Sequence, residues 1–412
     1  MALSASFKTV WSREMQEVFW PDSVWVAQAN FRLESQLKDG DRAKRLIPSK
    51  MVPQNYTRYN DITIQTGTTT AEELVVDTCP TIPFQISDLD ELQSTPKARQ
   101  PFTDMAMEQL NTILNGWYTA EVANALSTID AADFGGTAGQ GAAITSANVN
   151  KLFLLAQKKV GRTNVVNFKA GQSKFAANIT WDVYTALLEY LGNRDTALGD
   201  KTGENGHAGM WAGFDLYVHN GGYWTGKLNI ATNPTDGDTI VIKVHDQTIT
   251  LTWKTTLGST AGNIHIASSA ALSVANLVAS LNAPGTTVAS STDLGFVALS
   301  SDKQAALYGL TATDATTAVT ITWRGVGSPV TSETLTAAAD GWATGLNISQ
   351  NLFTKKGAVD MIVQRYPKIQ IDSDPDRIEE SIIKPYTLFG KKTFADGAKK
   401  MVNVKVETTS YT

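Results

Sequence analysis

The chain has 412 residues, which is enough for two or three domains with a sizeable buried core. Its hydrophobic content of 42% is ordinary for a globular protein, and its net charge of −5 predicts no general attraction to nucleic acid. Cys79 is the only cysteine, so an intrachain disulfide is excluded and a reducing compartment is expected.

The first segment is predicted to be an amphipathic helix that ends before Pro21. Its apolar residues recur at three-to-four spacing: Phe7, Val10, Trp11, Met15, Val18 and Phe19. The segment has no apolar stretch of the kind found in signal peptides, and no run in the chain has the length of a membrane span. We therefore expect an aromatic arm that packs on its own chain or on a neighbour, in a product made in a cytoplasm.

Residues 36–87 predict a long two-stranded excursion with little core of its own. Polar and β-branched residues alternate in this segment, notably at 61–64 and 74–76, around turn-forming spacers. Isolated hairpins are marginal in water, so such an excursion normally packs on a partner. Its basic residues either pair with acidic neighbours across an interface or form a solvated face; they are Lys38, Arg42, Lys44, Arg45 and Lys50.

Three helices are predicted next. After Pro101, apolar residues from Met105 to Ile129 keep helical spacing for nearly thirty positions, which predicts one long helix. The glycine-rich loop 135–143 follows and is expected to be a flexible connector. Ser146 is then expected to cap a helix that ends at Gly161, and a third helix is expected over about 180–192.

The stretch from about Leu228 to Gly345 differs in composition from both flanks. It holds 22 threonines but only 12 of the 75 charged residues of the chain. Glycines stand at both borders, as expected for a small β-rich domain inserted into an exposed loop of a larger host. The host is then formed by 1–227 together with 346–412.

Alternating apolar residues predict a β-hairpin over 240–253 inside this stretch. Ser273 is expected to cap a short helix, and a further strand is expected at 319–323. Beyond the stretch, 356–365 indicates a short strand or helix, and alternating valines predict a closing strand at 402–406.

The sequence offers two incomplete ligand-binding motifs. The glycine loop lacks the Gly-Lys-Ser/Thr ending of a phosphate-binding loop. Asp372, Asp374 and Asp376 match the first half of a calcium loop. However, Arg377 stands where glycine must turn the chain, and Ile383 stands where the bidentate glutamate belongs. A connector and a solvated acidic turn are the better interpretations.

No catalytic, cofactor-binding or metal-ligating residue is singled out. Asp88, Asp90 and Glu91 could support acid–base chemistry, but a charged loop accounts for them equally well. No serine lies in a nucleophile-elbow motif. The four histidines have no metal-ligand spacing: His207, His219, His245 and His265. We therefore expect a structural protein, not an enzyme, with no cofactor or metal.

Joined without the inserted stretch, the host consists of an aromatic arm, a β-excursion, a long helix, a glycine loop, two more helices and a strand-rich end. Particular segments carry a resemblance: 175–191 followed by 213–220, then 351–359, then 390–397 with the valines of 402–406. In their order and in their local sequence, these segments resemble the major capsid proteins of tailed double-stranded DNA phages, which have the Hong Kong 97-type fold. The resemblance covers most of both flanks.

The resemblance implies an α+β Hong Kong 97-type capsid fold with an inserted mainly-β domain. The long helix would be the spine helix of that fold. The implied parts are an N-terminal arm (1–35), an extended β-loop (36–87), the spine helix and peripheral domain (88–144), an axial domain (145–227), the inserted β-rich domain (228–345), and a return to the axial and peripheral domains (346–412).

The resemblance also implies a function, namely self-assembly into the icosahedral shell that encloses the phage DNA genome. The implied partners are the chain itself as hexamers and pentamers, a scaffolding protein and a portal during assembly, and packaged double-stranded DNA bound without sequence specificity; no membrane partner is implied. The location would be the virion, assembled in the cytoplasm of the bacterial host. Some relatives crosslink a lysine to an asparagine between subunits, but no such pair is identified here and none is expected.

Two alternatives remain open. A tail-tube, decoration or other virion protein would share the threonine-rich β-module but should lack the long helix. A carbohydrate-binding adhesin would suit the tryptophans of the β-rich part, which are Trp224, Trp253, Trp323 and Trp342. Such an adhesin would normally carry an export signal.

Overall fold

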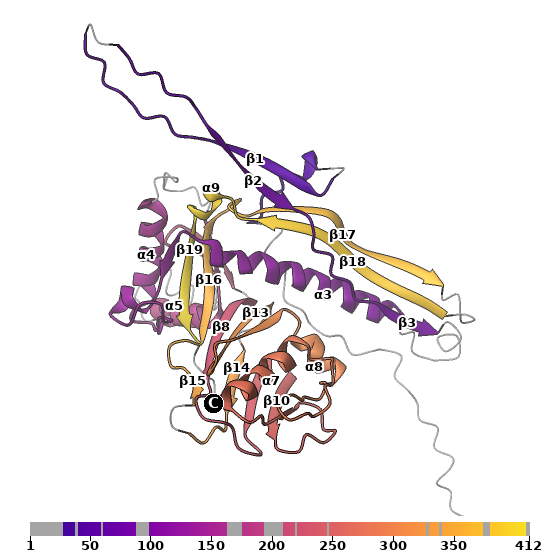
Figure 1. Cartoon of the computed structure of the whole chain (residues 1–412). Coiled ribbons are helices and arrows are strands. Elements are labelled where there is room, and N and C mark those ends of the chain that lie inside the picture. Colours follow the sequence, from indigo (N-terminus) through magenta and orange to yellow (C-terminus); the bar gives the residue numbers. More distant parts are fainter. Residues whose placement is uncertain are drawn as a thin grey trace, which may run out of the picture. The chain divides into compact units, whose positions relative to one another are not determined.

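The computed structural model describes residues 28–37, 40–58, 61–87, 99–162, 175–192, 209–218, 221–244, 247–326, 329–337, 340–373 and 380–408. The chain divides into two compact units. One holds the described residues of Ala29–Leu110 and Val359–Phe394; the other holds Gln28 and those of Asn111–Ala358 and Ala395–Thr412. Helices with mixed sheets confirm the predicted α+β class (Figure 1). The helix predicted near the N-terminus lies outside the described residues.

Antiparallel strands build the first unit. They are β1 (Arg42–Pro48), β2 (Thr69–Val75), β3 (Phe84–Ser87), β17 (Asp360–Ser373) and β18 (Glu380–Lys392), preceded by a 3-10 helix, η1 (Glu34–Gln36). β1 pairs with β2, and β18 pairs with both β17 and β3. The predicted two-stranded excursion is thus confirmed as β1 and β2, although residues 61–64 are not part of a strand. The ambiguous segment at 356–365 leads into β17.

A ten-stranded sheet organises the second unit. Its strands are β4 (Ser127–Ile129), β5 (Phe175–Ile179), β6 (Met210–Trp211), β7 (Phe214–Val218), β8 (Gly221–Asn229), β12 (Leu310–Asp314), β13 (Ala318–Val326), β15 (Gly341–Trp342), β16 (Ile348–Lys355) and β19 (Met401–Glu407). β16 lies at its centre and pairs with β19, β5 and β8. The predicted closing strand is confirmed as β19.

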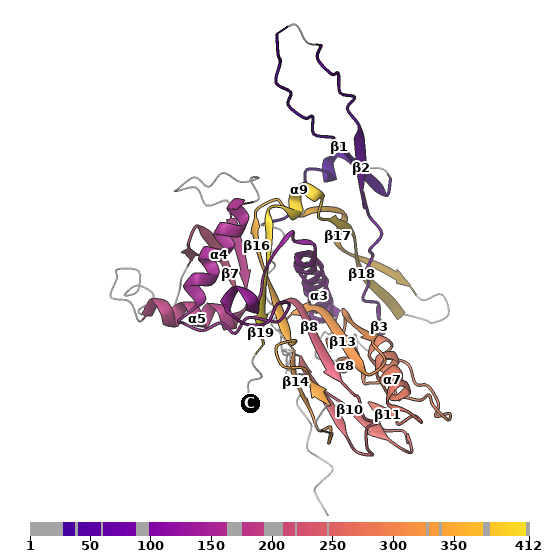
Figure 2. The ribbon, with the colours of Figure 1, turned by 60° about the vertical axis from the view of Figure 1, so that its left-hand side comes forward.

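Two helices, α4 (Val149–Arg162) and α5 (Trp181–Gly192), cover one face of this sheet (Figure 2). The apolar residues of α4 recur at three-to-four spacing, so they form one buried stripe. At the centre of the core, Phe153 of α4 packs edge-on against Phe353 of β16 with ring centroids 5.3 Å apart, and Phe214 lies 5.2 Å from Phe353. Offset and edge-to-face rings are the favoured packing of aromatic side chains.

The long helix is shorter than predicted. α3 covers Arg99–Ala120 and is followed by a 3-10 helix at Glu121–Asn124 and by β4. The apolar pattern continues beyond the helix because Val122 and Ile129 are buried in the 3-10 turn and in the strand. Hydrophobic spacing alone therefore placed the helix end too late.

The two predicted serine caps are wrong. α4 begins after Asn148, whose Oδ1 accepts a 2.8 Å bond from the Thr145 N–H, whereas Ser146 lies in the preceding turn. α7 (Ala270–Asn282) is capped by Ser269, whose Oγ accepts from the Leu272 N–H. Ser273 lies inside α7, where its buried hydroxyl donates to Asn233 at 2.7 Å. Several serines and threonines precede each helix, and local sequence does not rank them.

The inserted stretch has a core of its own. A second sheet joins β9 (Thr239–Val244), β10 (Gln247–Lys254), β11 (Asn263–His265) and β14 (Val330–Glu333), and two helices, α7 and α8 (Ser301–Ala306), lie beside it (Figure 2). The core between this sheet, α7 and the β12–β13 pair includes Trp253 and Trp323. It also includes Trp224 of β8, which precedes the predicted border at 228. The border itself remains a prediction.

The C-terminal part of α3 packs closely on β13. A Cβ added at Gly116 would lie 2.9 Å from the carbonyl oxygen of Arg324, a distance that real side chains do not reach. The guanidinium of Arg324 also lies over the Trp117 ring, 4.9 Å from its centroid. The helix therefore touches the backbone of the inserted stretch directly, and glycine is the residue that permits this approach.

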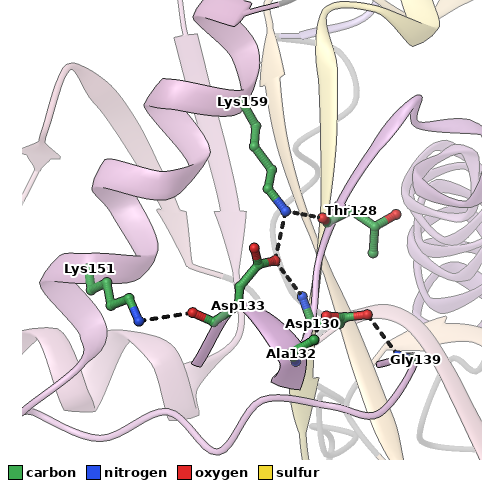
Figure 3. Close-up of polar contacts among 7 residues, drawn as sticks. All are labelled: Thr128, Asp130, Ala132, Asp133, Gly139, Lys151 and Lys159. Atoms are coloured by element: carbon green, nitrogen blue, oxygen red, sulfur yellow. Dashed lines mark hydrogen bonds and ion pairs between the residues drawn. The ribbon is translucent and has the colours of Figure 1, made fainter. Parts of the chain in front are cut away.

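A cluster of polar contacts holds the glycine-rich loop 135–143 (Figure 3). Asp130 caps a 3-10 helix, η3 (Ala131–Phe134), and accepts a 2.7 Å bond from the Gly139 N–H. Lys159 of α4 donates to Asp133 Oδ2 at 2.7 Å and to the carbonyl of Thr128. Asp130 therefore holds the loop directly, and Lys159 holds the 3-10 helix that precedes the loop. The flexibility expected for the loop stays a prediction.

Replacing Gly116 by Ala tests the close approach of α3 and β13. In an isolated helix this change is favourable by about 1 kcal/mol. Here we expect it to lower the free energy of unfolding by about 1–3 kcal/mol, because the methyl group must push the helix away from the Arg324 carbonyl. Gly161→Ala on α4 is the matched control, since no atom lies within 4 Å of its Cβ position. Urea denaturation that ranks the two variants equally would contradict this account.

Replacing Lys159 by Met tests the cluster around Asp133. The side chains of Lys159 and Asp133 are each about a quarter exposed. Loss of two charge-assisted bonds should therefore cost about 1–2 kcal/mol and accelerate hydrogen exchange of the Gly139 amide. Lys158→Met is the control, because Lys158 is the exposed neighbour on the same helix. Equal exchange at Gly139 in both variants would show that Lys159 does not order the loop.

Candidate assembly surface

The hairpin of β1 and β2 is anchored at its base. The Val76 N–H donates to the Asp41 carbonyl at 2.8 Å, and Leu74 is buried against Ile362 and Phe394. Gly390 of β18 lies so close to Val75 that a side chain there would meet its carbonyl oxygen. The hairpin thus leaves the first unit from a small, well-packed apolar cluster.

The basic residues of β1 find partners within the same unit. Arg42 donates to Glu73 of β2 at 2.8 Å, and Lys44 lies 3.8 Å from the same carboxylate. Arg45 stacks over the Phe394 ring, 5.2 Å from its centroid, and lies 4.0 Å from the buried Asp360. These three basic residues thus have partners within their own unit, and they do not require an acidic partner on a neighbouring subunit.

Beyond the strands, the distal part of the hairpin is held by side chains. The amide of Gln65 accepts from the Val52 N–H at 2.8 Å and donates to the Val52 carbonyl at 2.6 Å. Gln54 donates to the Thr63 carbonyl at 3.0 Å. These bonds keep the two arms of the hairpin together without a regular ladder, and nothing in the local sequence pattern indicated them.

This distal part exposes apolar side chains. Ile64 is 90% exposed and Ile62 is 64% exposed, and they are accompanied by Leu46, Met51, Val52 and Tyr56. Single exposed apolar residues are ordinary, but a group of them on one thin hairpin makes this segment a candidate for a protein–protein contact. Such a group has little apolar surface of its own hairpin to pack on, so burial requires another surface.

At its first described residues the chain is anchored in the second unit. Gln28 and Asn178 of β5 exchange two amide hydrogen bonds of 2.7 and 2.8 Å, and both side chains are buried. The Gly357 N–H donates to the Gln28 carbonyl at 2.7 Å. Tyr118 adds a long 3.5 Å contact, and burial raises the pKa of its hydroxyl, which therefore remains a neutral donor.

Of the three aspartates in the incomplete calcium motif, only Asp372 is among the described residues. Asp372 pairs with Lys384 at 3.0 Å, and this contact first and a bond from Gln370 second lower the pKa of its carboxyl group. Asp374 and Asp376 lie outside the described residues, as do Asp88, Asp90 and Glu91. Of the histidines, only His265 is described; it lies 3.4 Å from the Ser290 hydroxyl.

Among the described residues, no group of three or more histidine, cysteine, aspartate or glutamate side chains is placed to hold a metal ion. Within the same part of the chain, no helix is both long enough and apolar enough to cross a membrane.

Comparison with known proteins gave matches at the level of structure. No family model matches the sequence, and no curated protein sequence matches it. A solved structure of Mycobacterium phage Che8 matches with a TM-score of 0.55 at 12% identity over 98% of both chains. The capsid structure of the cyanophage P-SCSP1u gives 0.53 at 11% identity over 98% of this chain and 94% of that one. The mature capsid of bacteriophage PhiM1 gives 0.50 at 9% identity over 98% and 93%.

The matched structures are similar to this chain from end to end, so the inserted stretch and the flanks are covered together. This agrees with the β1–β2 hairpin and the long helix α3, which the sequence resemblance had implied in this order. The chain has the Hong Kong 97-type fold of tailed-phage capsid proteins.

Proposed function

We propose that this chain is a major capsid protein, which assembles into the closed icosahedral shell of a tailed phage and encloses its double-stranded DNA genome. The observation that carries the proposal is the fold match over 98% of the chain to solved phage capsid structures. The exposed apolar side chains of the distal hairpin support this proposal, because a shell needs surfaces that become buried only against neighbouring subunits. The role includes no catalytic step.

The proposal extends to partners and location. Copies of the chain would form hexamers and pentamers, with a scaffolding protein and a portal taking part in assembly in the bacterial cytoplasm. The mature location would be the virion. A net charge of −5 suits a wall that must not bind its DNA cargo tightly, since nonspecific DNA affinity depends on neutralising phosphates.

Electron microscopy of the full chain, expressed together with a scaffolding protein, tests this function. Closed polyhedral particles are expected. Tubes would favour a tail-tube protein, and dispersed small species would favour an adhesin or a decoration protein; either result overturns the proposal.

Charged substitutions on the distal hairpin test its role in assembly. We expect Ile62→Asp with Ile64→Asp to abolish closed particles while changing the free energy of unfolding by no more than about 0.5 kcal/mol, as is usual at exposed positions. Thr63→Asp, also exposed and on the same segment, controls for added charge. Particles that form normally from the double variant would exclude the hairpin as an assembly contact.

A protease experiment examines the same segment without substitution. Residues 49–58 and 61–68 are exposed and lie outside strands, so free subunits should be cut there first, and assembly should slow the cut by burying the segment. Identical cleavage rates before and after assembly would be incompatible with an interface role.

We also propose that the inserted β-rich domain folds independently, with a border earlier than 228. Trp224 is buried in the core of this domain and lies opposite Trp323 across the β8–β13 ladder. A fragment of residues 221–345 should therefore melt cooperatively, and one of residues 228–345 should be less stable by several kcal/mol, as expected when a large buried aromatic side chain is lost. Melting curves that coincide would refute the earlier border, and two disordered fragments would refute independent folding.

A further inference from the structure

β12 is the last strand at one end of the ten-stranded sheet, and among the described strands β13 is its only ladder neighbour. A strand in this position presents a row of backbone N–H and C=O groups to the outside. Such an edge is a template for pairing with a strand of another chain. On β12 the outward groups lie at alternate residues, with Ala312 at the centre of the five-residue strand.

The outward groups of Ala312 are already occupied by a side chain. Asn282, the last residue of α7, donates from Nδ2 to the Ala312 carbonyl at 2.9 Å and accepts at Oδ1 from the Ala312 N–H at 2.8 Å. A carboxamide carries one donor and one acceptor side by side, as a peptide unit does. Asn282 therefore makes the same two bonds that a residue of a neighbouring antiparallel strand would make.

A second backbone group on this edge also has a partner. The Leu310 N–H, which lies on the same side as that of Ala312, donates to the Leu307 carbonyl at 2.9 Å. At the other end the strand stops at Asp314, whose carboxylate accepts from the Thr316 N–H at 2.6 Å. Ala312 lies at the centre of the strand and is therefore the position about which an added antiparallel strand would pair.

We propose that Asn282 blocks the β12 edge and so prevents two copies of this chain from joining their sheets. A second copy is the occupant that the edge fits best, because antiparallel pairing about Ala312 is two-fold symmetric and self-complementary. It would set Thr311 of each copy beside Thr313 of the other, and threonine pairs are favourable across strands. In a protein that acts in many copies at high local concentration, an open edge of this kind would compete with the intended contacts.

Asn282→Ala in the full chain removes both bonds and tests the proposal. Sedimentation of subunits without scaffold should show dimers and larger species at concentrations at least tenfold lower than for the parent chain. Ser269→Ala is the matched control: it removes the cap at the opposite end of the same helix and weakens α7, but leaves Ala312 covered. Equal association in the two variants would mean that Asn282 only stabilises the domain, and would overturn the proposal.

Asn282→Ala combined with Ala312→Pro separates edge pairing from unfolding. Proline has no N–H and is tolerated on edge strands where that group faces outward. The combination should return the association to that of the parent chain, although it restores no stability. Should Asn282→Ala be recovered only as aggregate, soluble yield becomes the measurement, and the combined variant must be soluble. Persistent aggregation of the combined variant overturns the proposal.

Discussion

One edge of β16 pairs with two different strands, and the structure of the second unit depends on this arrangement. Residues 348–350 pair with β8, and residues 352–355 pair with β5. Between them stands Asn351, whose buried side chain accepts a 2.7 Å bond from the Thr180 N–H at the junction of β5 and α5. An N–H buried there without a partner would cost free energy, so the asparagine fixes the point at which the two strands diverge.

This arrangement determines how the inserted stretch is attached. β8 gives Trp224 to the core of the inserted stretch while its neighbouring residues pair with β16 of the host. A shared strand transmits displacement through backbone hydrogen bonds, unlike a flexible linker. The contact of Gly116 with the Arg324 carbonyl adds a second rigid connection, to α3. The different composition of the inserted stretch therefore corresponds to a separate hydrophobic core. This core is joined to the host by direct contacts, not by a flexible linker.

The sequence predicted those elements that alternate or repeat regularly over several turns. Val402, Val404 and Val406 alternate because they lie on the one face of β19 that packs on the core of the second unit. The apolar stripe of α4 is regular because it packs on the same core. The end of α3 was misplaced because apolar spacing continues through a 3-10 turn into β4. The spacing of apolar residues indicates which residues are buried, and buried residues continue beyond the end of the helix.

Contacts made over long sequence distances could not be predicted in this way. Asp130 and Asp133 have the spacing of a capping box, so the contact between them could be predicted from the local sequence. No feature of the sequence indicated Lys159 as the partner of Asp133. The same holds for Asn282 and Ala312, which are thirty residues apart. Hydrogen-bond partners of single side chains leave no periodic signal, whereas strands and helices do.

The low identity of 9–12% to structures of the same fold follows from what the fold requires. A core needs apolar residues of suitable volume at given positions, and many sequences supply them. The exposed surfaces carry a different requirement, because in the proposed shell a subunit must offer some surfaces to its neighbours and withhold others. Ile64 on the distal hairpin is offered to solvent almost completely, whereas the backbone of Ala312 is covered by one asparagine. In the two proposals above, the first surface is available to a neighbouring copy and the second is withheld from one.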